Sequence, residues 1–367
     1  MTTRPAELLA RTLRGDASWA AGDDWDGDAL VRSAAHHGVT ALLWQALQHD
    51  AAAPAALTSR LARVAAAEVA RTALLERELA AVLRAFDTHG VNVVVMTGAA
   101  LAYTCYPRPW LRRRTDTDVL IDRVSFDRAA GALASVGYAQ ASAISTGEFV
   151  SHQAAFERRD GHGLVHAVDV HWKAVNPRIL SEAISFRDVW KESRLVSLAG
   201  TTVRVPDAPW SLVLACVHRL AHHQDQERLG WLYDLHLLAG AFQAPEWDRV
   251  VEIARAGRIS AICADGLGAA AHHLGTSVPA AVLEALGRAG RSEPSRGYAE
   301  REQRRLAVLR DDLRHLPRWR DRMRLLREHA FPPASFMLAR YESRQRAWLP
   351  ALYVHRLVTG AWKWMRA

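Results

Sequence analysis

The pattern of apolar residues changes abruptly at residue 90, and this change limits the folds open to the chain. Residues 58–90 repeat apolar side chains at three- and four-residue spacing and contain no Pro or Gly before Gly90. This pattern predicts one helix of about 30 residues. The next residues, VNVVVMTG, form a short β-branched run that stops at a glycine, as a buried strand does. A helical region is therefore followed at once by an α/β unit.

Three segments follow from the pattern along the chain. Helical spacing extends over residues 5–87 and returns from Pro209 onward. Between them, strand and helix patterns alternate, with helices expected directly after Gly98 and after Ser125. The expected strands are VNVVVMTG, DTDVLI, EFVSHQAAFERR, GLVHAVDVHWKAV and the hairpin SRLVSLAGTTVRVP. We therefore predict an α/β (α+β) fold, a small mixed-sheet core (88–206) between an N-terminal helical region (1–87) and a C-terminal helical domain (207–367).

Composition constrains the compartment and the partners. The formal net charge of +8 favours an anionic partner, although Arg and Ala are abundant throughout the chain. Three cysteines, Cys105, Cys216 and Cys263, lack metal-ligand spacing, which favours a reducing compartment. The N-terminus has no apolar signal region, and no apolar run reaches the roughly 20 residues of a membrane span. A cytoplasmic protein without a transmembrane segment is expected.

Two acids stand one residue apart at the start of the apolar run DTDVLI. Side chains alternate along a strand, so Asp116 and Asp118 project to the same side. Like charges so close raise one another's pKa unless a cation lies between them, and Mg²⁺ (or Mn²⁺) is the usual cation for carboxylate oxygens. Asp169 lies in a second strand, HAVDVHW, whose Val168 and Val170 would face the opposite side. Three acids from two strands can hold two metal ions.

A phosphate-binding pattern lies next to these acids. A strand that ends at Gly98 and turns into a helix presents backbone N–H groups to an anion. Three consecutive arginines then precede the acids and can neutralise a polyphosphate. Together these features favour a nucleoside triphosphate ligand. The candidate nucleotide-binding residues are Thr97, Gly98, Ala99, Arg112, Arg113, Arg114 and Lys173.

Other polar residues are secondary candidates. His171 would share a strand face with Asp169, where it could orient an acid or hydrogen-bond an acceptor. His218 and His222 have a zinc-compatible spacing but no third ligand, so zinc is not predicted. Asp234 is expected to cap or pair within the helical domain, beside His218.

These residues carry a resemblance to a known family. The stretches VNVVVMTGAALAYTCYPRPWLRRRTDTDVLID (91–122), VDVHW (168–172) and 214–238 resemble the bacterial family of uncharacterised nucleotidyltransferases in the polymerase-β-like superfamily. The resemblance implies a mixed sheet that carries the acids, metal-dependent nucleotidyl transfer, and metal roles for Asp116, Asp118 and Asp169. Thr97 stands where the family commonly has Lys, and Ala99 where the superfamily often has Ser, so two phosphate contacts of relatives are missing.

The expected activity is transfer of a nucleoside monophosphate from an NTP, with ATP the expected donor, to an acceptor hydroxyl, with release of pyrophosphate. A small-molecule acceptor is favoured. Toxin-like transfer to tRNA or protein and a non-catalytic nucleotide-binding module are the alternatives. Arginines of residues 296–346 beside the site would favour RNA. The Trp-rich residues 348–365 are expected to pack on the protein rather than to lie on a membrane surface.

Overall fold

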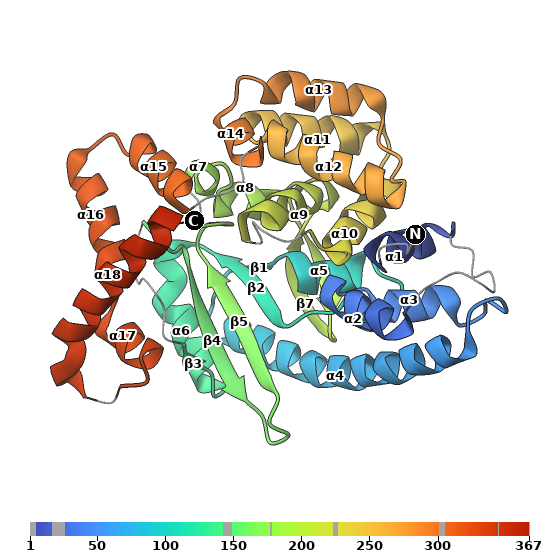
Figure 1. The fold of residues 1–367 in the computed structure, drawn as a ribbon, viewed down its shortest axis with the longest axis horizontal. Helices are drawn as coiled ribbons and strands as arrows, with labels where there is room; N and C mark the ends of the chain where they lie inside the picture. The colour runs from blue at the N-terminus through green and yellow to red at the C-terminus, as the bar shows by residue number, and fades with distance from the viewer. Residues whose placement is uncertain are drawn as a thin grey trace.

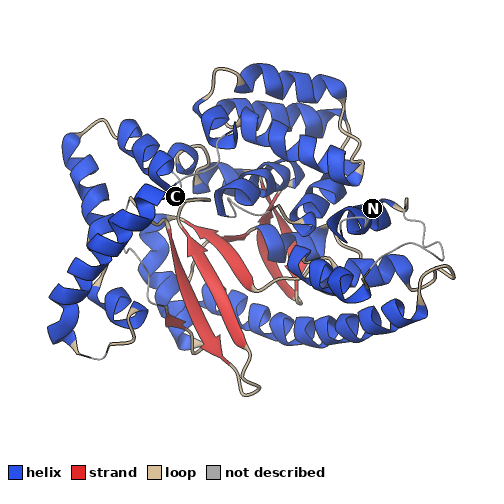
Figure 2. Ribbon diagram, in the orientation of Figure 1, coloured by secondary structure: helices blue, strands red, loops and turns tan. Residues whose placement is uncertain are grey.

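The computed structural model describes residues 5–16, 26–141, 149–176, 178–222, 227–300, 305–343 and 345–366. Its centre is a seven-stranded sheet with the order β3-β4-β5-β2-β1-β7-β6. Figure 1 shows helices on both sides of this sheet, and Figure 2 shows that helix dominates the rest of the fold. The predicted mixed α/β architecture is confirmed.

The strands form the predicted mixed sheet. They are β1 (Val93–Val95), β2 (Asp116–Ile121), β3 (Ala139–Gln140), β4 (Gln153–Arg159), β5 (Val165–His171), β6 (Ser193–Leu198) and β7 (Thr201–Pro206). β2 pairs in parallel with β5, and β1 in parallel with β7, while all other pairs are antiparallel. The expected hairpin turns at Ala199 and Gly200, whose φ angles of 49° and 74° are those of a tight turn between twisted strands.

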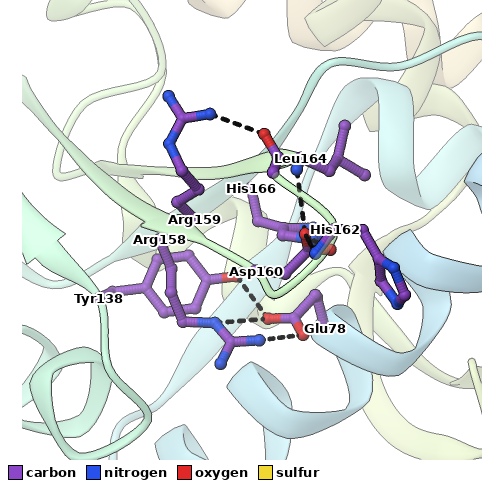
Figure 3. Close-up of polar contacts among 9 residues, drawn as sticks. Glu78, Tyr138, Arg158, Arg159, Asp160, His162, Leu164 and His166 are labelled. Carbon is purple, nitrogen blue, oxygen red and sulfur yellow. Dashed lines mark hydrogen bonds and ion pairs between the residues drawn. The ribbon is translucent and has the colours of Figure 1, made fainter.

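The β4–β5 hairpin is tied to the long N-terminal helix α4 (Ala55–Thr88) by the polar contacts of Figure 3. Glu78 of this helix pairs with Arg158 and accepts a hydrogen bond of 3.3 Å from the Tyr138 hydroxyl. At the turn, Asp160 bonds the buried His166 ring at 2.8 Å. These contacts fix the position of β5, which carries part of the candidate site.

One group of helices precedes the sheet in the sequence, and a second group lies between its strands. The N-terminal ones are α1 (Pro5–Arg14), α2 (Gly27–His37), α3 (Thr40–Leu47) and α4, which has 34 residues where about 30 were predicted. Those inserted between strands are α5 (Thr97–Thr104), η1 (Pro109–Leu111), η2 (Arg123–Ser125), α6 (Phe126–Ser135), α7 (Arg178–Ser181) and α8 (Phe186–Lys191).

Helix α5 begins earlier than its sequence suggests. It was expected after Gly98, but its first residue is Thr97. The Met96 N–H still bonds the Asp118 carbonyl of the neighbouring strand at 2.9 Å, and Thr97 then adopts a φ of 41°. The chain therefore turns from strand to helix within one residue, and it does so at a threonine rather than at the glycine.

The C-terminal helices extend the fold well beyond the sheet. They are α9 (Ala208–His222), α10 (Leu229–Gly240), α11 (Ala244–Ala256), α12 (Ser260–Leu274), α13 (Ala280–Gly290), α14 (Pro294–Glu300), α15 (Arg305–His315), α16 (Trp319–Ala330), α17 (Ala334–Arg340), η3 (Arg346–Trp348) and α18 (Leu349–Arg366). Within the part of the chain that the structure describes, no helix has the length and apolar character needed to cross a bilayer.

The two faces of the sheet pack into different cores. Alternation along β2 sends Val119 and Ile121 into a cluster with α4 and α6. Leu120 instead joins a larger cluster that includes residues of α1–α3 and α9–α13. Asp116 and Asp118 are four and two positions before Leu120, so their side chains point to the same face of the sheet as Leu120 does. That is the face that α9 and its neighbours cover.

Candidate active site

Strands β2 and β5 bring the predicted acids together. In their parallel register Asp118 lies directly opposite Asp169, and Asp116 lies opposite Ala167. The intervening Val168 belongs to the cluster on the other side of the sheet, as the alternation predicted. Asp116, Asp118 and Asp169 therefore share one face of two adjacent strands.

Asp118 is the most constrained of the three carboxylates. Its side chain is buried, and the Thr97 hydroxyl donates a hydrogen bond of 2.7 Å to its Oδ2. The Nε2 of His171 lies 3.0 Å from its Oδ1. Both carboxylate oxygens are thus held by side chains from neighbouring elements, one at the start of α5 and one at the end of β5.

A candidate metal site lies among these residues. Asp118, Asp169 and His171 each offer a ligand atom, and the three atoms lie within 4.8 Å of one another. Asp116 is not part of this group, although its charge acts on Asp169 and His171. The group therefore includes the histidine that the sequence suggested only as a secondary candidate.

The electrostatics of the site favour a cation. Burial, together with the charges of Asp118 and Asp116, raises the pKa of Asp169 to about 6. Burial and the Asp118 charge also raise the pKa of Asp116. A cation placed between carboxylates relieves both effects, because it favours the charged form of each.

The pKa of Asp118 is lowered rather than raised, and His171 is the main cause. Burial alone would raise the pKa of this carboxyl, but the hydrogen bond from His171 and the charge on that ring hold it below its usual range. Burial opposes the charged imidazole as well, yet the Asp118 hydrogen bond raises the pKa of His171. The two residues form a buried charged pair at the centre of the acidic group.

The junction between β1 and α5 lies beside Asp118. The first turn of a helix carries N–H groups without intrahelical partners, here those of Thr97, Gly98 and Ala99. A Cβ on Gly98 would meet only ordinary contacts, at 3.9 Å from Arg112 Nη2 and 4.0 Å from Arg114 Cβ. The packing of the chain itself therefore does not require glycine at this position.

The three predicted phosphate-binding arginines each have a partner in the protein. Arg112 forms a bidentate pair with Asp234 of α10, with N–O distances of 2.7 to 3.0 Å. Arg113 donates to the Ala35 carbonyl at 3.1 Å. Arg114 is buried and donates to Thr117, whose position on β2 alternates away from the acids.

The remaining secondary candidates are distributed around the site. β5 ends at His171, so Lys173 lies beyond the strand, where it forms an ion pair with Glu182. His218 of α9 is half-buried, and loss of solvent contact lowers its pKa, whereas the Asp118 charge is the strongest influence in the other direction. The side chain of His222 lies outside the described residues.

Sequence patterns missed three contacts at or near the site. The Thr97 bond to Asp118 was not foreseen, because Thr97 was considered only as a nucleotide-binding residue in the place of a Lys. Gln153 of β4 donates to Asp169 at 3.4 Å, and the signal for it was the alternation of β4 beside β5. The Tyr106 hydroxyl donates to Asp234 at 2.7 Å, a contact across 128 positions that no local pattern announces.

A mixed sheet with carboxylates on two adjacent strands, beside a strand–glycine–helix junction, is the arrangement that the sequence predicted for a nucleotidyltransferase. The model of the family described as "Uncharacterised nucleotidyltransferase" matches residues 23–275, which is more than half of the chain, so the chain belongs to this family. Membership implies an NTP donor and a divalent metal, for which Asp118, Asp169 and His171 are a candidate site.

Several solved structures match this chain. One of them is the crystal structure of an antigenic nucleotidyltransferase-like protein from Paracoccidioides brasiliensis, which covers 57% of this chain and 95% of its own at 15% sequence identity, with a TM-score of 0.37. A comparison with curated proteins gave no match.

Proposed function

We propose that this chain is an active, metal-dependent nucleotidyltransferase that moves the NMP group of an NTP, with ATP the expected donor, to a hydroxyl of a small molecule. The observation that carries the proposal is the placement of Asp118 opposite Asp169 on parallel strands, with Asp116 on the same face. A degenerate site would have no reason to retain three carboxylates whose burial and mutual repulsion are costly.

Asp116, Asp118 and Asp169, with His171 as a further donor, would hold Mg²⁺ or Mn²⁺. Their oxygens suit a hard cation, and two of the three acids have pKa values that proximity and burial have raised. When bound, the metal supplies polarisation of the phosphate oxygens and neutralises their developing charge.

The protein's own groups have separate tasks in this proposal. The N–H groups of Gly98 and Ala99 at the start of α5 bind phosphate oxygens, and Gly98 leaves space for their approach. Asp169, which lies at the metal site, also accepts the proton of the acceptor hydroxyl. The hydroxyl oxygen bonds to the α-phosphorus, the bond from that phosphorus to the bridging oxygen breaks, and pyrophosphate leaves.

The three arginines have different roles in the proposal. Arg113 is the most exposed of the three, with 41% of its side chain accessible, so it is the one placed to turn towards a triphosphate. Arg112 is bound to Asp234, so we assign it the task of positioning the loop before β2 as well as its predicted phosphate contact. Arg114 and Lys173 stay sequence predictions, as does a cytoplasmic location.

The test is calorimetric binding of the four nucleoside triphosphates, each with and without Mg²⁺. The parent chain is compared with Asp116→Ala/Asp118→Ala, and Asp122→Ala is the matched control, because Asp122 follows the same strand but only caps η2. We expect magnesium-dependent binding that vanishes in the double variant and persists in the control. Equal binding by parent and double variant would refute the metal site.

A second measurement separates catalysis from binding alone. Slow pyrophosphate release from the bound nucleotide, with water as a poor acceptor, supports the enzyme and should be lost in Asp169→Asn. Tight binding with no pyrophosphate release under any condition would support the non-catalytic module. A survey of small molecules, tRNA and protein as acceptors of α-phosphate-labelled ATP then distinguishes the acceptor classes.

A further inference from the structure

The last helices of the chain differ in charge from everything before them. Residues 305–366 contain 14 Lys or Arg and 5 Asp or Glu, a formal charge of +9. The whole chain carries +8, so the rest of the protein is close to neutral. This segment also begins after residue 275, where the family match ends. The basic character of the protein therefore belongs to an appended unit and not to the nucleotidyltransferase core.

The same segment holds most of the exposed large apolar side chains. Among the residues that the structure describes, 11 large hydrophobic side chains are exposed, and eight of them lie in this segment. They are Trp319, Met323, Leu326, Phe331, Trp348, Val354, Leu357 and Val358. Single exposed apolar residues need no explanation, but such a concentration in one unit marks an interaction surface.

On α16 the exposed residues form an amphipathic stripe. Trp319, Met323 and Leu326 are spaced by four and three positions, so they lie on one side of the helix, with exposed fractions of 69%, 55% and 37%. Exposed arginines at positions 320 and 324 alternate with them along the helix. An apolar stripe edged by guanidinium groups is thus presented to solvent.

Helix α18 presents a second exposed apolar stripe. Val354 and Val358 are 61% and 66% exposed and one turn apart, and Leu357 lies beside them at 42%. The side chains of residues 361–367 lie outside the described residues. The expectation that this C-terminal stretch packs on the protein thus holds for one side of α18, where Tyr353 contacts Phe331, and not for this side.

The unit that carries both stripes is anchored to the fold. Leu325 of α16 is fully buried in a small cluster with Phe149 and Leu316. The Tyr353 hydroxyl of α18 donates to the Pro332 carbonyl at 2.6 Å. Figure 1 shows α16, α17 and α18 at one edge of the molecule. The exposed stripes therefore belong to an ordered surface at the periphery.

We propose that this surface, defined by α16 and α18, docks the protein on an anionic lipid bilayer, with both helices lying in the plane of the membrane. Apolar side chains would enter the boundary of the acyl region, and the arginines would meet lipid phosphates. The partner must be anionic because the unit carries +9. It must also offer an apolar phase, because the stripes are largely aliphatic.

Two other partners fit these observations less well. A second copy of the chain would bring the same +9 unit against itself across a two-fold axis, which is electrostatically unfavourable. Single-stranded RNA is bound by stacking of bases on planar side chains, and of the six side chains in the two stripes only Trp319 is planar. Both partners are outcomes of the test below.

The experiment is flotation of the full-length chain with vesicles of phosphatidylcholine, with and without about 30% phosphatidylglycerol. We expect binding to the anionic vesicles that is at least about fivefold stronger than to neutral ones and that weakens with salt. Val354→Ser/Val358→Ser should weaken binding about tenfold. Val124→Ser/Leu195→Ser is the matched control, because both residues are exposed, at 82% and 62%, and lie outside the unit.

Several results would overturn the proposal. These are no flotation with either vesicle, equal flotation of the two serine variants, tight binding to a single-stranded RNA oligonucleotide without vesicle binding, or a dimer that Val354→Ser/Val358→Ser dissociates. The variant Asp116→Ala/Asp118→Ala should bind vesicles like the parent, so failure of the nucleotidyltransferase proposal leaves this measurement unaffected.

Discussion

The three carboxylates of the candidate site differ in their chemical state. Asp118 is held charged by Thr97 and His171, whereas burial pushes Asp116 and Asp169 towards the neutral form. One acid is therefore a fixed negative charge, and a cation favours the charged form of the other two. This division is the physical reason why pH should control metal binding.

Metal binding should weaken as the pH falls through about 6. Asp169 has a pKa of about 6, above the usual value of 3.8, so below that pH it carries a proton that a metal must displace. Protonated His171 opposes the metal in the same direction. We expect Mn²⁺ affinity to fall by up to about tenfold per pH unit below pH 6. Calorimetry at pH 7.5, 6.5 and 5.5 checks this, and a flat profile would contradict it.

Without metal, Asp169→Asn should stabilise the fold. The pKa of Asp169 is raised in the folded state, so its charge destabilises folding at neutral pH, and this cost fades as the pH falls from about 6 towards 4. The amide removes the cost, which we expect to raise stability by about 1 to 2 kcal/mol at pH 7.5.

The gain from Asp169→Asn should nearly disappear at pH 4, where Asp169 itself is neutral. Urea unfolding at both pH values measures it, with the exposed Asp248→Asn of α11 as the control that changes little. A loss of stability at neutral pH would mean that the carboxylate is already compensated in the metal-free protein.

At this scale the sequence predicted the acids, and it suggested His171 as a residue that could orient one of them, but not the other contacts around the site. Asp116, Asp118 and Asp169 follow from strand alternation, which is a local rule. The Arg112–Asp234 pair joins residues 122 positions apart, so no periodicity could have paired them. Three adjacent arginines look alike in the sequence, and only tertiary packing shows that they have three different partners.

Among the helices and strands, some follow from local sequence patterns, whereas the bounds and pairing of others are set by tertiary packing. The long helix, strands β4 and β5, the β6–β7 hairpin and the alternation of side chains along β5 were all predicted, because alternation and helical spacing there are uninterrupted. The start of α5 was misplaced because backbone bonding to β2, and not the glycine, sets it. The parallel pairing of β2 with β5 places Asp118 opposite Asp169. The register of this pairing could not be predicted, because neither strand's own sequence specifies which residues of the other strand lie opposite.

The ion pair between Arg112, in the loop before β2, and Asp234 of α10 should contribute strongly to the stability of the fold. Arg112 and Asp234 are both buried, with 14% and 5% of their side chains exposed. Removal of one partner leaves a buried charge, so Arg112→Met and Asp234→Leu should each cost about 3 to 5 kcal/mol, and the double variant clearly less than their sum. Urea unfolding of the parent, the two single variants and the double variant measures the coupling free energy between Arg112 and Asp234.

The matched control is the exposed pair of Arg249 and Glu252 on α11, where Glu252→Gln should cost less than about 0.5 kcal/mol. Nucleotide binding by the same variants separates two tasks of Arg112. If it contacts phosphate as predicted, Arg112→Met lowers affinity more than Asp234→Leu does. Equal effects would mean that the arginine only positions the loop.

For the whole molecule, the hydrophobic cores cut across the predicted division of the chain. The largest cluster takes residues from α1–α3, from the sheet and from α9–α13. The unit around α16 instead rests on the small cluster of Leu325. The division into residues 1–87, 88–206 and 207–367 stays a prediction, and the distribution of the cores suggests how to test it.

Two leucines of equal burial should respond differently to the same change. Leu30 of α2 and Leu325 of α16 are 1% and 0% exposed, but they belong to the large and the small cluster respectively. Leu30→Ala should cost about 2 to 5 kcal/mol and lower the main thermal transition, with amide protection lost together in α2, α10 and α12. Leu325→Ala should raise exchange in α16 while the main transition hardly moves, because that cluster is separate. If Leu30→Ala instead frees α2 alone and leaves α10 and α12 protected, residues 1–87 are an independent domain, as the sequence division predicted.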